Sequence, residues 1–253
     1  MNFSRATLGF IGLFWMAAAI LLIFLTLLGG VRNNNPVNRV YFLQADTGNI
    51  PGAPAVSRWT FWNLCGVTAN GRNDCGETHV QFPFDPASHR NFDTTENVPH
   101  QFVEHSGHYF LMSRFMFPFI IIGLFFAVCS LFTGLLAMFT RVASYLSSLL
   151  AWIALIFQII TTCLMTAVFV QGRRAFSQNG QVSKLGVKAF AFMWTASALI
   201  FLSCLMYCLG GAVGRKDTGA GYSGRKERRR GFFSSQRNGS VKSQKQETSA
   251  NYA

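Results

Sequence analysis

Two cysteines, Cys65 and Cys75, stand with nine residues between them in a polar stretch of the chain. Cysteines so close together most simply form a disulfide where their loop lies outside the cytosol, because such compartments are oxidising. Closing so short a loop would stabilise the fold by about 2–3 kcal/mol on the chain-entropy model. The pair therefore predicts a disulfide if this stretch is extracellular, and two free thiols if it is not.

The other four cysteines lie within apolar runs, and two of them, Cys204 and Cys208, are one helical turn apart. Cysteines near a membrane surface can be S-acylated. Cysteines buried among apolar neighbours more often act as small hydrophobic residues. Both interpretations stay open for this pair.

All five histidines fall between residues 79 and 108. Three of them, with Glu104, could bind a metal ion or respond to pH: His100, His105 and His108. A metal site needs ligands on ordered elements with supporting hydrogen bonds, whereas residues 87–107 are polar and irregular in pattern. We therefore expect a solvated loop here, with no metal and no cofactor.

The polar residues show no pattern typical of an enzyme. We find no nucleophile and base at a suitable spacing, no phosphate-binding loop and no cluster of metal ligands in an apolar run. The apolar runs also contain no Asp, Glu, Lys, Arg or His, and ion-coupled transporters usually place such residues within the membrane. The sequence thus predicts a non-enzymatic protein and disfavours a transporter or channel subunit.

The C-terminal residues 214–253 are basic and account for much of the net charge of +12. Their polar composition predicts disorder, because it cannot bury enough apolar surface to offset chain entropy. A basic cluster followed by two phenylalanines could bind anionic lipid, with about 1 kcal/mol per cation: Arg225, Lys226, Arg228, Arg229 and Arg230. A solvated tail that only sets topology is the alternative, and nucleic-acid binding is not expected because no folded surface displays these charges.

Four apolar runs must position these residues, at 8–28, 115–139, 146–170 and 190–213. Each reaches the roughly 20 residues that cross a ~30 Å hydrocarbon core. The first run is too long for a signal-peptide core and has a poor cleavage site, so we interpret it as a retained span. The chain is therefore expected to be a four-transmembrane-helix protein.

The basic tail favours a cytoplasmic C-terminus, and an even number of spans then puts residues 1–7 in the cytoplasm too. Residues 29–114 and 171–189 become extracellular loops, and 140–145 a cytoplasmic turn. Four basic residues around the second loop oppose this orientation: Arg173, Arg174, Lys184 and Lys188. The tail and the cysteine pair outweigh them.

The first loop shows strand patterns at 40–43, 58–65 and 78–82, with a tight turn at 70–74 inside the cysteine loop. We expect a small β-sheet whose hairpin arms the disulfide joins. The fold class is then an all-α membrane bundle with a disulfide-tied extracellular sheet. Small residues at helical spacing on the second span permit close packing, within the chain or in a homo-oligomer: Gly123, Ala127, Ser130 and Gly134.

The pattern Trp62-x2-Cys65-x9-Cys75 in the first loop of a four-span chain is similar to that of claudin-like tetraspans. Further motifs sharpen the likeness: Arg58-Trp59-Thr60, Cys75-Gly76, Pro83-Phe84-Asp85-Pro86 and Asn91-Phe92. Together they resemble the fungal SUR-seven/PalI family of plasma-membrane tetraspans. The resemblance implies that Trp62 packs beside the disulfide and that the sheet is extracellular.

The same resemblance implies a role in organising eisosome-associated microdomains of the plasma membrane, in cortical patches. It links the chain to cell-wall integrity, endocytosis and stress responses, and to cortical eisosome proteins and anionic inner-leaflet lipid as partners. A related branch of the family implies an alternative, an accessory role in ambient-pH signalling. Trp59 and Trp62 could contact a partner or lipid headgroups, although a structural role in the sheet is expected.

Overall fold

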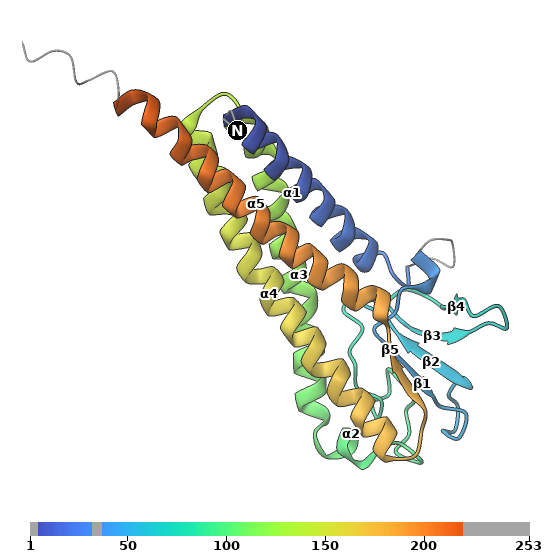
Figure 1. Cartoon of the computed structure of the whole chain (residues 1–253). Helices are drawn as coiled ribbons and strands as arrows, with labels where there is room; N and C mark the ends of the chain where they lie inside the picture. The colour runs from blue at the N-terminus through green and yellow to red at the C-terminus, as the bar shows by residue number, and fades with distance from the viewer. Residues whose placement is uncertain (1–4, 32–36, 220–253) are drawn as a thin grey trace, which may run out of the picture. The chain divides into compact units, whose positions relative to one another are not determined.

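The computed structural model describes residues 5–31 and 37–219. Residues 1–214 form one compact unit, and of the second unit, 215–253, only 215–219 are described. Among the described residues, four helices are long and apolar enough to cross a membrane: α1 (Arg5–Leu27), α3 (Ser106–Ala137), α4 (Arg141–Gln178) and α5 (Val187–Gly219). Within the first unit they run side by side, with a small sheet near one end (Figure 1). The predicted fold class is confirmed.

The sheet has five short strands in the order β4-β3-β2-β1-β5, and each neighbouring pair is antiparallel. Four come from the first loop and one from the connection between α4 and α5: β1 (Leu43–Asp46), β2 (Val56–Trp59), β3 (Leu64–Val67), β4 (Asn73–Asp74) and β5 (Ser183–Leu185). Leu43 pairs with Trp59 on one side and with Leu185 on the other. The two loops therefore build a single structure.

The predicted strand 58–65 is wrong, because the chain reverses in its middle. The Thr60 hydroxyl accepts hydrogen bonds from the backbone N–H groups of Trp62 and Asn63, at 3.3 and 3.1 Å. The backbone N–H of Thr60 also donates to the Asn63 carbonyl at 3.0 Å. A threonine that bonds the backbone two and three residues ahead closes a turn, so the segment holds the end of β2 and the start of β3.

Two other strand predictions shift. Of the predicted strand 40–43, only Leu43 belongs to β1. The return arm predicted at 78–82 is wrong, since β4 lies nearer in sequence and closes the hairpin directly after the turn. The turn between β3 and β4 is thus shorter than a return arm at 78–82 would require.

The helices also extend beyond the apolar runs. A short helix α2 (His100–Glu104) and then α3 replace the irregular structure predicted up to residue 107. In α3 the added turns bury Tyr109 and Ser113, and at the end of α4 they bury Phe176. These turns flank the sheet, beyond the ends of α1 and α5 (Figure 1). Tertiary packing thus prolongs helices that apolar composition alone would end sooner.

One continuous core connects the bundle to the sheet, from Met16 on α1 through Phe42 and Trp59 to Met193 on α5. Several polar side chains inside the bundle have hydrogen-bond partners on their own helix. The hydroxyls of Thr161 and Thr162, for example, donate to helix carbonyls four residues earlier, at 2.9 and 2.8 Å. Such bonds let polar residues lie in an apolar bundle at low cost.

Candidate functional site

The disulfide hairpin is the first part of the candidate site. Cys65 on β3 and Cys75, directly after β4, are bonded, with their Cα atoms 4.2 Å apart. The Cys65 side chain is buried. Gly66 pairs with Asp74 inside the loop that the bond closes. The disulfide predicted from the cysteine spacing is confirmed, and it covalently joins β3 to the residue that follows β4.

Trp59 is the centre of the interface between the sheet and the helices. Its side chain is 1% exposed, and its ring lies 5.2 Å from that of Phe84, 5.9 Å from Phe92 and 5.5 Å from Phe176, centroid to centroid. The indole N–H donates to Asn91 Oδ1 at 2.9 Å. These neighbours come from the long loop and from α4, so one side chain joins three segments.

Trp62 makes a second junction, at the turn between β2 and β3. Its indole N–H donates to the Leu27 carbonyl at the end of α1, and its ring lies 5.3 Å from that of Phe117 on α3. The side chain is half-buried. Both tryptophans therefore hold the sheet onto the bundle, as the structural interpretation of these residues expected.

The Pro83–Pro86 segment packs against the extended turns of α3 and α4. The Phe84 backbone N–H donates to Ser113 Oγ at 2.9 Å, and its ring is 2% exposed. Gly172 on α4 leaves room for that ring, because a Cβ there would stand 2.6 Å from it. The segment thus packs between the sheet and the helices α3 and α4.

Asp85 in this segment is buried at the start of α3. Ser106 Oγ donates to Asp85 Oδ2 at 2.6 Å. Burial raises the pKa of Asp85, and the hydrogen bond from Ser106 acts in the opposite direction. A carboxylate near a helix N-terminus also complements the helix dipole. Asp85 is thus a positioning contact for α3.

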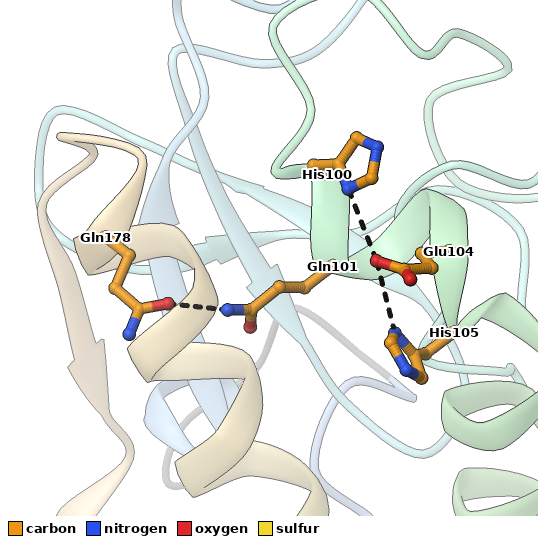
Figure 2. A network of polar contacts seen from close by, with 5 residues as sticks. All are labelled: His100, Gln101, Glu104, His105 and Gln178. Atoms are coloured by element: carbon orange, nitrogen blue, oxygen red, sulfur yellow. Dashed lines mark hydrogen bonds and ion pairs between the residues drawn. The ribbon is translucent and has the colours of Figure 1, made fainter.

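The histidines predicted to form a solvated loop lie partly on α2. His100 Nδ1 is 3.4 Å from Glu104 Oε2, and His105 Nδ1 is 4.0 Å from the same oxygen. Figure 2 shows the two imidazoles flanking Glu104, while Gln101 reaches Gln178 at the end of α4, with 2.6 Å between Nε2 and Oε1. All three side chains are well exposed.

His108 is not part of that network in Figure 2. Among the described residues, no group of three or more His, Cys, Asp or Glu side chains is placed to hold a metal ion. The exposed pairs around Glu104 contribute little to stability, since surface ion pairs are worth about 0–1 kcal/mol.

The two cysteines considered for acylation differ in exposure. Cys204 is fully buried in the bundle, whereas Cys208 is exposed and lies 2.9 Å from Ser148 Oγ. An acyl chain needs an accessible thiol. Acylation stays a prediction, and the structure directs it to Cys208.

The small residues of α3 pack within the chain. A Cβ on Gly123 would stand 3.3 Å from Phe157 of α4, and Ser130 Oγ donates to the Ser147 carbonyl at 2.9 Å. Gly134 faces the ring of Tyr207 on α5. Close intramolecular approach therefore accounts for this spacing.

The basic cluster of the tail lies outside the described residues.

Sequence reasoning assigned no contacts to several polar residues that position the site, although Arg58 and Asn91 belong to the motifs of the family resemblance. Asn91, Ser113 and Asn73 each bond a residue far away in the sequence, and so does Arg58 on β2. Their types are ordinary in polar loops, so only the tertiary structure reveals their partners. The strand β5 was missed for the same reason.

Comparison with known proteins agrees with this architecture. The family model described as SUR7/PalI family matches residues 8–206. A SUR7 family protein, FMP45, of Saccharomyces cerevisiae is 34% identical over 207 residues, 81% of this chain and 66% of the relative. Protein SUR7 of Candida albicans is 33% identical over 202 residues, 79% of this chain and 73% of the relative.

A third relative, from Saccharomyces cerevisiae, is described as an uncharacterized plasma membrane protein and is 30% identical over 199 residues, 78% of this chain and 65% of the relative. The chain spans about two thirds of the length of these Saccharomyces proteins. The matched region contains most of each of the four long helices and the whole sheet. The resemblance found in residues 58–92 extends over most of the chain, which belongs to the SUR7/PalI family.

Proposed function

We propose that this chain is a non-enzymatic plasma-membrane protein that organises or stabilises a cortical, eisosome-associated microdomain. Family membership supports the proposal, and one relative carries the description of a plasma membrane protein. The observation that carries it is the aromatic junction at Trp59, which joins the sheet to the helices in one core. A rigid cap on an apolar bundle suits a scaffold better than a transport path.

The proposal places both termini in the cytoplasm and the sheet outside. The disulfide supports this orientation, because disulfides persist in oxidising compartments. The sheet would then face the cell wall. This arrangement gives a physical link to cell-wall integrity, endocytosis and stress responses.

Lateral association is the second part of the proposal. The small-residue face of α3 is occupied within the chain, so contacts with other copies or with cortical proteins would use lipid-facing side chains. Several large apolar side chains are exposed on α1 and α3, including Phe14 at 65% and Phe132 at 63%. The basic cluster of the tail would add contacts to anionic lipid of the inner leaflet.

Live imaging tests the proposal. A fluorescently tagged copy at native expression is imaged beside a cortical eisosome marker, with a uniformly distributed plasma-membrane protein as control. Stable patches that coincide with the marker are expected. Uniform plasma-membrane signal would count against the microdomain, and retention in internal membranes would contradict the plasma-membrane location.

An accessory role in ambient-pH signalling is the second candidate. The observation in its favour is the exposed pair of imidazoles on either side of Glu104 (Figure 2). Imidazole is the side chain that most readily changes charge near neutral pH. Growth at alkaline pH distinguishes the signalling role from the microdomain role. Only the signalling role requires a growth defect when His100 and His105 are both changed to Gln.

A further inference from the structure

A basic pocket of about 460 Å³ lies where the sheet meets the start of α5. Three cations line it, each from a different element: Arg39 from the 3-10 helix η1 (Val37–Arg39), Arg58 from β2 and Lys188 from α5. None of the described residues around the pocket is acidic. The pocket therefore gathers three positive charges, with no acidic side chain among the described residues that line it.

The guanidinium of Arg58 is held in place by neutral hydrogen-bond partners only. Its side chain is 8% exposed, and Nε donates to Gln44 Oε1 at 2.9 Å. Nη1 donates to the Gly71 carbonyl at 3.0 Å and to Asn73 Oδ1 at 2.9 Å. No hydrogen bond within the described residues uses Nη2. A buried charge is costly unless an opposite charge accompanies it, so Arg58 offers a held, unneutralised guanidinium.

The other two cations add to this charge. Burial lowers the pKa of Arg58; the nearby Tyr41 raises it, and the positive charge of Arg39 lowers it further. Arg39 and Arg58 line the same pocket, so their positive charges act on each other there. Among the described residues, the ion pairs join only His100 and His105 to Glu104, so Arg39 and Lys188 are not paired.

Lys188 also lies in the first turn of α5, which contains no acidic residue. The first backbone N–H groups of a helix lack intrahelical partners and carry partial positive charge. The positive charge of a lysine at this end opposes the helix dipole, whereas an anion bound there interacts favourably with both the lysine and the helix end. The start of α5 and the three cations thus line the same pocket.

We propose that this pocket binds the phosphate of a phospholipid headgroup, in the leaflet next to the sheet. The apolar span of α5 begins at Val187, which lines the same pocket and is 76% exposed. The pocket therefore lies at the level where a span passes from hydrocarbon to headgroups. A phospholipid satisfies both the cations and Val187, whereas free phosphate would satisfy only the cations. This site is separate from the tail and goes beyond the proposed microdomain role.

Photo-crosslinking of the full-length chain in nanodiscs tests the proposal. The probe is phosphatidylglycerol with a photoactivatable headgroup, and the crosslinked peptides are identified by mass spectrometry. Crosslinks to the segment 185–188 are expected. The variant Arg39→Gln/Lys188→Gln should lower their yield roughly tenfold or more, given the contribution of two cations. Both residues are exposed, so folding should be retained, whereas Arg58→Gln would disturb the sheet.

The control Arg173→Gln/Lys184→Gln removes the same charge from exposed residues that do not line the pocket, and it should keep the wild-type yield. Equal yields from all three proteins, or crosslinks to the tail alone, would overturn the proposal. Full competition by inorganic phosphate at the lipid's own concentration would assign the pocket to a free anion instead, which contradicts a lipid site. None of these outcomes depends on whether the protein forms cortical patches.

Discussion

Replacing Trp59 with alanine should detach the sheet from the helices. The indole is 1% exposed and contacts the rings of Phe84, Phe92 and Phe176. The variant would leave a cavity among these rings and an unpaired Asn91 Oδ1. Trp59→Phe is the milder change, since it keeps most ring packing and removes only the hydrogen bond and part of the volume.

The magnitude follows from these contacts. Truncation of a buried tryptophan to alanine costs about 3–5 kcal/mol, and the lost hydrogen bond places the variant near the upper end of that range. Trp59→Phe should cost about 1–2 kcal/mol, chiefly from the hydrogen bond. For a chain of this size, the alanine variant should lower the melting temperature by roughly 10 °C.

The assay is thermal stability of the purified full-length chain in mild detergent, followed by size-exclusion elution. Trp194→Ala is the matched control, because Trp194 lies on α5 and is 48% exposed. Its loss should change stability by less than about 0.5–1 kcal/mol. Equal melting temperatures for Trp59→Ala and Trp194→Ala would refute the assignment of Trp59 as the junction.

Three further changes test other contacts. Cys65→Ser breaks the disulfide and should cost about 2–3 kcal/mol, seen as poor delivery to the cell surface; normal delivery would contradict a structural bond. Gly172→Ala places a Cβ 2.6 Å from the Phe84 ring and should cost about 1–3 kcal/mol in thermal unfolding. Gly107→Ala on α3, with open space around it, should be neutral or slightly stabilising. Because burial raises the pKa of Asp85, stability should fall as pH rises from the unfolded-state pKa through the folded-state pKa. Asp85→Asn should remove this dependence. The melting temperature of the variant should therefore rise relative to that of the wild type as the pH increases from acid to neutral. Parallel pH profiles of the two melting temperatures would contradict this account.

The helices and the disulfide could be predicted from sequence because each depends on local information. A run of about 20 apolar residues defines a membrane-spanning helix almost alone. Helix boundaries could not be predicted in the same way. The turns of α3 that contain Tyr109 and Ser113 are polar enough to suggest a loop, and they are helical because they pack against the sheet and the Phe84 segment.

The sheet was harder to predict because its pairing is not local. The stretch from Arg58 to Cys65 alternates like one strand, yet the Thr60 hydroxyl closes a turn within it. The three residues of β5 pair with β1, more than a hundred positions earlier in the chain. The role of Arg58 is likewise visible only when Gln44 and Asn73 are brought to it by folding.

The microdomain role is tested most directly by deleting the gene that encodes this chain in the cell that normally expresses it. Patches of a cortical eisosome marker are counted and their lifetimes measured in the deletion strain, and then after re-expression of the wild type or of Trp59→Ala. Fewer or shorter-lived patches are expected in the deletion strain, restored by the wild type and not by the variant. Unchanged patch number and lifetime in the deletion strain would contradict the proposed organising role.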